Sequence, residues 1–253
     1  TEDIFISSLD PAGNFRWARQ IGTGLNGQER ANSITTDARG NVYVTGYFRG
    51  TAYFGNDSLV TGGSNANAFI TKLDTAGNFI WAARLGGAAT SIGYSIVVDE
   101  QGNVFTTGQF AGVTDFNPDP VGTYPLTALG TGLNAIDIFV SKLDSSGNFV
   151  WAKRFGGKFI DHGNDVTLDS AGNIYVTGVF VDTVDFNPGG TGGLRVSAML
   201  DTLANLLQPI KTSDIFVLKL DPSGTFNWVA ALGGNAVDVG HSIAVDKEGN
   251  VYT

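Results

Sequence analysis

The chain has 253 residues, enough for one large all-β domain or two smaller ones. It contains 35 glycines but only 15% charged residues, a composition typical of many short strands and turns. No cysteine is present, which excludes disulfides and thiolate metal sites. The net charge of −9 argues against a nucleic-acid-binding or anionic-membrane surface. No apolar run approaches the ~18 residues of a membrane span, so we expect no membrane insertion.

A D-x-x-G-N pattern recurs along the chain, and each copy separates two short alternating apolar segments. The aspartate can accept a hydrogen bond from the backbone amide two residues ahead, and the glycine suits the left-handed position of a bulged hairpin. The spacing also resembles part of a calcium loop, but the copies lack further carboxylates inside the loop. The pattern therefore predicts hairpins. Its copies begin at Asp10, Asp37, Asp74, Asp99, Asp144, Asp169 and Asp246, with a D-P-S-G-T variant at Asp221.

Four strands are predicted in each repeat, and we name them A to D in chain order. They are rich in Val, Ile, Phe, Tyr and Thr, and the D-x-x-G-N turns join A to B and C to D. Strand C is expected at 3–10, 67–74, 137–144 and 214–221, and strand D at 15–22, 79–86, 149–156 and 226–233. Strand A is expected at 32–37, 94–99, 164–169 and 241–246, and strand B at 41–48, 103–110, 173–180 and 250–253.

The segments between strands B and C vary in length, at 49–66, 111–136 and 181–213. Each contains two apolar pieces, so we expect an extra hairpin or an elaborated loop on every repeat. Residues 196–207 have the apolar spacing of a helix and predict a short surface helix. Loops that vary on a repeated frame commonly carry binding functions, and we expect these segments to contact a protein or glycan partner.

The repeats predict an all-β fold, a β-propeller of four-stranded antiparallel blades in a single domain, 1–253. One meander cannot bury both of its faces, and stacking the sheets around an axis solves that problem. Three repeats are whole, and the two ends form complementary halves of a fourth. We therefore expect a four-bladed ring; the alternatives are part of a larger propeller and a homo-oligomer completed by exchanged half-blades. The repeats are 32–86, 94–156, 164–233, and 241–253 joined with 3–22.

One tryptophan occupies the same place in every strand D, which predicts an anchor for packing between blades; the alternative is a set of stacked aromatic side chains that bind sugars. These residues are Trp17, Trp81, Trp151 and Trp228. No signal peptide is visible, and Thr1 falls inside a repeat, so we expect a mature form or a piece of a longer protein.

The beginning of strand A lies nearest the axis in a propeller, and polar residues gather there. They form a candidate ligand site in the axial channel; alternatively they satisfy backbone groups and ordered water. The candidates are Asn32, Tyr94, Asn164 and His241 in one register position, with Asp161, Asp165 and Asp238 close by.

One local pattern has the spacing of metal ligands. Asp115, Asn117 and Asp119 present three oxygens at alternate positions, as calcium prefers. The equivalent segments of the other repeats do not keep the three oxygens, and Asn-Pro also begins turns. Calcium is the one cofactor that the sequence raises. The histidines, His162 and His241, are too few for a typical zinc site, and no hydrolase, zincin or P-loop motif occurs, so we expect no catalytic residues and no enzyme.

The joined pattern at 137–157, 165–178 and 183–189 resembles the seven-bladed β-propeller repeat called SBBP, and the resemblance covers essentially the whole chain. It implies a bacterial exported or cell-surface protein. The V-D-x-x-G-N-V-Y-V pattern is more distantly similar to NHL-type propellers, some of which are enzymes with an axial metal held by histidines. Only His241 of this chain falls in the axial set.

Three functions are compatible with these patterns. The first is a non-catalytic scaffold for protein interaction or extracellular assembly on a bacterial surface. The second is a carbohydrate-binding propeller, with an aromatic platform from Tyr53, Phe54, Phe116 or Phe186. The third is an enzyme with its site in the axial channel, which lacks a catalytic motif.

Overall fold

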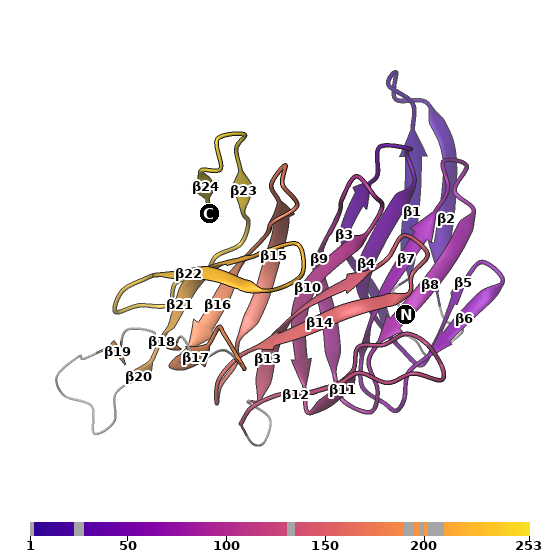
Figure 1. Ribbon diagram of the computed structural model, residues 1–253. Coiled ribbons are helices and arrows are strands. Elements are labelled where there is room, and N and C mark those ends of the chain that lie inside the picture. Colours follow the sequence, from indigo (N-terminus) through magenta and orange to yellow (C-terminus); the bar gives the residue numbers. More distant parts are fainter. Residues whose placement is uncertain (1–2, 23–27, 131–134, 190–194, 198–199, 202–209) are drawn as a thin grey trace.

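The computed structural model describes residues 3–22, 28–130, 135–189, 195–197, 200–201 and 210–253 (Figure 1). Every regular element within these ranges is a β-strand. The all-β class predicted from the repeats is therefore confirmed. In the described part of the chain, no helix is long and apolar enough to cross a membrane.

Three complete blades form the body of the molecule, each a four-stranded antiparallel sheet in the predicted A-B-C-D order. The first blade contains β3 (Gln28–Thr36), β4 (Val42–Arg49), β7 (Asn67–Leu73) and β8 (Phe79–Leu85). The second contains β9 (Ser91–Val98), β10 (Val104–Ala111), β13 (Ile136–Leu143) and β14 (Phe149–Phe155). The third contains β15 (His162–Leu168), β16 (Ile174–Val181), β21 (Ser213–Leu220) and β22 (Phe226–Leu232).

The insertions between strands B and C form extra hairpins, as predicted. These pairs are β5 (Thr51–Phe54) with β6 (Asp57–Val60), β11 (Val113–Asp115) with β12 (Pro125–Thr127), β17 (Thr183–Asp185) with β18 (Arg195–Ser197), and β19 (Leu200–Asp201) with β20 (Ile210–Lys211). The predicted helix at 196–207 is wrong where it can be compared, because its described residues lie in β18 and β19; the rest of that segment lies outside the described residues.

The D-x-x-G-N turns have the predicted hairpin geometry. In the turn of the second blade, Asp144 Oδ1 accepts hydrogen bonds from the amides of Ser146 and Asn148, at 2.8 and 2.9 Å. The Asn148 side chain donates to Asp144 Oδ2 at 2.9 Å, and Gly147 has a φ of 86°. The hydrogen bonds from Asn148 and the backbone lower the pKa of Asp144 even though partial burial opposes them.

Buried aromatic and aliphatic side chains fill the spaces between successive sheets. One cluster lies between β1–β2 and the first blade and includes Trp17, Phe54 and Phe69. The next clusters join the first blade to the second and the second to the third, around Phe116 and Phe186 respectively. Because each cluster contains residues from adjacent sheets, every blade is stabilised mainly by its neighbours.

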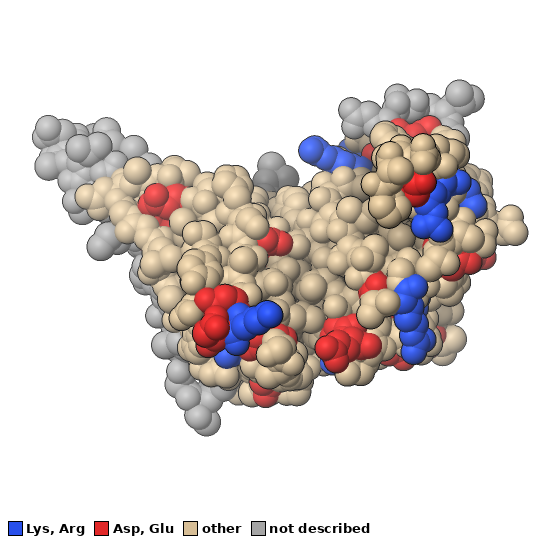
Figure 2. Space-filling model, turned by 90° about the horizontal axis from the view of Figure 1, so that it is seen from above, with Lys and Arg blue, Asp and Glu red and all other residues tan. Residues whose placement is uncertain are grey.

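The two terminal hairpins do not join into a fourth blade. They form two separate two-stranded sheets. In one, β1 (Ile4–Leu9) pairs with β2 (Phe15–Ile21), and in the other, β23 (Ala244–Val245) pairs with β24 (Val251–Tyr252). Figure 1 shows them at opposite ends of an open arc of blades. The closed ring of four blades is therefore not formed. Seen from above, one side of the molecule is hollowed (Figure 2).

Candidate functional site

A bulge in strand A shapes the axial face of the arc. The register with strand B shifts between Ala31 and Ser33 in the first blade, and at the equivalent place in the second and third. The residues at the bulges are Asn32, Tyr94 and Asn164. A bulge leaves one residue unpaired and redirects it, and these side chains accordingly line an axial cavity.

The cavity has a volume of about 490 Å³ and is mostly polar. It is lined by Arg30, Asn32, Tyr47, Ile92, Tyr94, Asn164 and His241. The sequence analysis thus named four residues that the fold brings together. Two of them also have a structural role: the amide of Asn32 donates to the Gly93 carbonyl at 2.8 Å, and that of Asn164 to the Gly240 carbonyl at 2.9 Å. These hydrogen bonds tie strand A of the first blade to that of the second, and strand A of the third blade to the C-terminal segment.

Asp165 holds three successive strand A segments together beside the cavity. Its Oδ1 accepts from the Ser95 hydroxyl at 2.6 Å, and its Oδ2 accepts from the Ser242 hydroxyl at 2.7 Å. The amide of Ile243 donates to the same Oδ2 at 2.9 Å. With these partners Asp165 joins the second blade, the third blade and the C-terminal hairpin.

The structure places Asp161 and Asp238 outside the axial cavity. Asp161 is fully buried, and its two oxygens accept from the amides of Val181 and Gly157 at 2.9 and 2.8 Å. Asp238 Oδ2 accepts in the same way from the amide of Gly234 at 2.9 Å. Neither residue is among those that line the cavity. Both carboxyls bind the amide of a glycine that follows strand D, and Asp161 also binds the last amide of β16.

The two histidines occupy different surroundings. His241 is exposed and lines the cavity, whereas His162 lies beside Tyr94 with 6.1 Å between ring centroids. Burial lowers the pKa of His162, so this imidazole is neutral near pH 7. Across the described residues, no group of three or more His, Asp or Glu side chains is placed to hold a metal ion.

The calcium-like segment forms a succession of Asx turns. Asp115 Oδ1 accepts from the Asn117 amide at 3.0 Å, Asn117 Oδ1 from the Asp119 amide at 3.0 Å, and Asp119 Oδ1 from the Val121 amide at 2.8 Å. Each of these oxygens is thus engaged locally with the backbone. This geometry gives the calcium prediction no support.

The aromatic platform predicted for carbohydrate binding is wrong for three of its four residues. Phe54, Phe116 and Phe186 are at most 1% exposed, because they pack between blades. Tyr53 is 54% exposed on the β5–β6 hairpin. The hairpins also expose Val60, Val113 and Val121. Partner binding by these insertions stays a prediction.

The strand D tryptophans reach toward the C–D turn of the following blade. Trp17 donates from Nε1 to the Thr75 carbonyl at 3.0 Å, and Trp81 to the Ser145 carbonyl at 3.3 Å. A Cβ added at the turn glycines Gly77, Gly147 or Gly224 would overlap or crowd Trp17, Trp81 or Trp151 respectively. Trp228 packs against Tyr175 of its own blade, with 6.2 Å between ring centroids.

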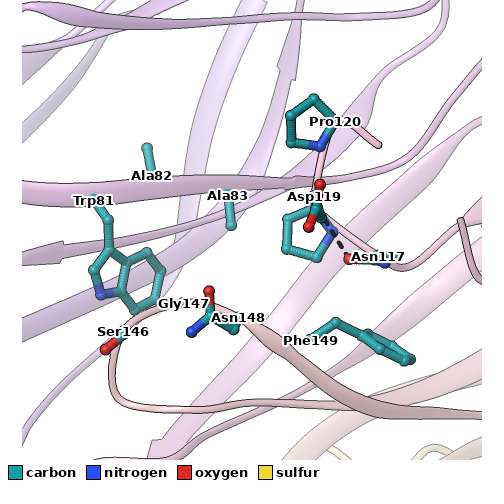
Figure 3. Close-up of a pocket in the computed structure, with 11 residues that line it drawn as sticks. Trp81, Ala82, Ala83, Asn117, Asp119, Pro120, Ser146, Gly147, Asn148 and Phe149 are labelled. Atoms are coloured by element: carbon teal, nitrogen blue, oxygen red, sulfur yellow. Dashed lines mark hydrogen bonds between the residues drawn. The ribbon is translucent and has the colours of Figure 1, made fainter. Parts of the chain in front are cut away.

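A second concave site lies between the first and second blades, and sequence reasoning missed it. It is a groove of about 540 Å³ between β8 and the 146–149 turn, bordered by the 117–120 loop (Figure 3). Its apolar part is formed by Trp81, Ala83, Pro118, Pro120 and Phe149. Its polar part is formed by Asn117, Asp119, Ser146 and Asn148. Two sequence signals could have indicated it: the Pro-Asp-Pro run at 118–120, which the other insertions lack, and a small residue at position 83.

The blades, their inner strands lining an axis and their aromatic inter-blade packing define a propeller-type repeat protein. The model of the SBBP family, described as a beta-propeller repeat, matches residues 16–47, 80–109, 150–179 and 227–253. The chain thus contains four SBBP repeats. An uncharacterised WD repeat-containing protein of Acanthamoeba polyphaga mimivirus is 26% identical over 196 residues. That match covers 71% of this chain and 13% of the viral protein, so the chain spans a small part of its relative.

Proposed function

We propose that the chain is a non-catalytic propeller scaffold that assembles with a second copy of itself through its terminal hairpins. The unpaired edges of β1 and β24 carry this proposal. In each whole blade a strand B pairs with a strand C. Among the residues that the structure describes, β1 is a strand C with no strand B beside it, and β24 is a strand B with no strand C beside it. Edges of this kind are templates for further strand pairing.

The whole blades predict the register of the composite blade. Val42 pairs with Leu73, Val104 with Leu143 and Ile174 with Leu220. The equivalent pair in the terminal hairpins is Val251 with Leu9 of a second copy. β23–β24 of one chain and β1–β2 of the other would then form one four-stranded sheet.

The inter-blade anchors support the same assembly. Gly77, Gly147 and Gly224 lie against the tryptophan of the preceding blade, but a Cβ at Gly13 would meet nothing within 4 Å. At the other end, Trp228 faces no C–D turn of a following blade among the described residues. The turn at Gly13 therefore matches the surface at Trp228. Assembly would also cover Phe5, Phe15 and Leu232, which are 78, 68 and 47% exposed.

A scaffold function agrees with the propeller repeats and with the WD-repeat relative. We place the assembly outside a bacterial cell, as the resemblance implies. The terminal hairpins would join copies, and the insertion hairpins would stay available to other partners.

Light scattering of the purified chain tests the assembly. We expect a species of at least twice the 26.5 kDa chain mass. In a double variant, Ser8→Cys with Tyr252→Cys, oxidation is expected to link two chains, because the predicted register places these residues opposite each other. A wild-type protein that stays monomeric would contradict exchange between copies. A disulfide that forms within one chain of the double variant would contradict it as well.

A matched pair of glycine variants supplies the control. Gly13→Asn is expected to dissociate the assembly, because its side chain would meet Trp228 of the second copy. Gly50→Asn is the control: Gly50 has a similar φ, 81° against 83°, and equally open surroundings, but lies outside the proposed contact. Equal masses for the two variants would argue against the proposal.

A further inference from the structure

We propose that the groove between the first and second blades binds a neutral saccharide. The groove runs along β8 from Trp81 to Ala83 and faces the turn that contains Ser146 and Asn148 (Figure 3). Its volume of about 540 Å³ falls within the ~300–1,000 Å³ of typical small-molecule sites. This site is distinct from the terminal hairpins and from the axial cavity.

Apolar rings and polar groups lie side by side in the groove. Trp81, Phe149 and the two prolines offer flat apolar surface, which suits the C–H face of a sugar ring. Polar atoms lie close by. Asp119 uses Oδ1 to accept from the Val121 amide, which leaves Oδ2 as an acceptor. Saccharide hydroxyls both donate and accept, so they can use such a mixture.

Two asparagines are held in position by the loops that carry them. The Asn148 side chain donates to Asp144 Oδ2 at 2.9 Å, which leaves its Oδ1 as an acceptor. Asn117 Oδ1 accepts from the Asp119 amide at 3.0 Å, which leaves its side-chain nitrogen as a donor. Groups fixed before binding lose little conformational entropy on contact with a ligand.

A substitution within the repeat leaves this groove without a basic side chain. Arg19 occupies the position of Ala83 in the N-terminal half-blade, and Lys153 in the second blade. The Arg19 guanidinium lies over the ring of Trp17, 5.8 Å from its centroid, and donates to the Ala76 carbonyl at 3.1 Å. It thus adds a positive charge to the equivalent concave surface, which has a volume of about 600 Å³ and is also lined by Trp17 and Thr75. Ala83 has no such side chain, so the groove beside Trp81 has no Lys or Arg among the described residues that line it.

The charge of the groove favours a neutral ligand. Asp119 is the one charged side chain among the groove's described lining residues, and the whole chain carries a net charge of −9. An acidic saccharide would be repelled. The hydroxyls of a neutral saccharide can donate hydrogen bonds to the carboxylate and amide oxygens without charge repulsion.

A glycan array of neutral and acidic saccharides, followed by calorimetric titration of the best-bound neutral glycan, tests the inference. We expect the wild-type chain to bind neutral glycans and Asp119→Asn to bind about fivefold more weakly. Ser146→Arg is expected to weaken binding at least tenfold by blocking the groove. The second variable position of the D-x-x-G-N turn already holds Arg39, Gln101 and Glu248 elsewhere, so the fold tolerates long side chains there.

Ala76→Arg is the matched control, because it places the same side chain at the same turn position one blade earlier. It is expected to bind like the wild type, and all variants should keep the wild-type melting temperature. Binding of no glycan, binding of acidic glycans alone, or equal losses for Ser146→Arg and Ala76→Arg would overturn the inference.

Discussion

Asp161 shows how a single buried carboxyl ties stability to pH. It lies between the second and third blades with Asp137 nearby, and burial, reinforced by the charges of Asp137 and Asp182, raises its pKa to about 8. Burial also raises the pKa of Asp137 to about 6, although Arg154 contacts it at 2.9 Å. Both groups therefore hold protons in the folded state at pH values where the unfolded chain has released them.

We expect the free energy of unfolding to fall as the pH rises from about 4 toward 8. Across this window the folded state binds more protons than the unfolded state, and that difference removes stability with rising pH. Asp161→Asn should flatten the decline, because the amide does not titrate. Urea unfolding at several pH values measures the slope, and an unchanged slope in the variant would contradict this assignment.

The turn aspartates act in the opposite direction. Hydrogen bonds from the turn lower the pKa of Asp74, Asp144 and Asp246, so their contribution is present above an ordinary aspartate pKa and is lost as the pH falls through the lowered value. Together with the buried pair, they place the stability maximum in mildly acidic solution.

Gly108 illustrates a steric requirement at the residue scale. The bulge in β9 directs the Ile92 carbonyl at Gly108, where a Cβ would overlap that oxygen. Gly108→Ala is expected to cost about 3 kcal/mol or more, because backbone must move to accept the methyl group. Gly87→Ala is the control, since a Cβ there meets nothing within 4 Å. Denaturant unfolding of the two variants gives the comparison, and similar losses would argue against the overlap.

At the element scale, strand D joins each blade to the next through its tryptophan. Trp81 packs edge-on against Tyr43, with 6.2 Å between centroids, and reaches the turn of the second blade. Trp228 has the equivalent tyrosine, Tyr175, but no turn beyond it in the described residues. The same residue type therefore makes contacts to two blades in one case and to one in the other.

Trp81→Ala is expected to destabilise the chain by about 3 kcal/mol, as large aromatic truncations do. Trp228→Ala should cost less in the dissociated chain but should weaken assembly. Unfolding at low protein concentration, with light scattering at high concentration, separates the two effects. Equal destabilisation and equal assembly would show that the two tryptophans have the same role.

At the scale of the whole molecule, β1–β2 and β23–β24 each pack against a neighbouring sheet on one side only, within the described residues. A protein that associates through its folded state becomes more stable as its concentration rises. We therefore expect the melting temperature to increase with chain concentration, and Gly13→Asn to abolish the increase. Differential scanning fluorimetry over a hundredfold concentration range provides the test. A constant melting temperature in the wild type would contradict assembly.

Local chemistry explains why so much of the fold was predictable from the sequence. Asp144 and Gly147 specify their hairpin through neighbouring amides and a left-handed φ, and alternating Val, Ile and Phe specify the strands. The register of the repeats also identified Asn32, Tyr94, Asn164 and His241 as neighbours on the axis. These features depend on residues close in sequence or related by the repeat.

Only the tertiary structure decided which blades meet and what lies between them. Three features depend on adjacent sheets. They are the orientation of Asp161 toward Gly157 and Val181, the burial of Phe116, and the open groove beside Ala83. The sequence allowed the terminal hairpins to close a ring or to remain apart, because their pairing signals are the same in both cases. The strand pairing settled that choice, since β1–β2 and β23–β24 form separate two-stranded sheets and no hydrogen-bonded register joins them in the described part of the chain.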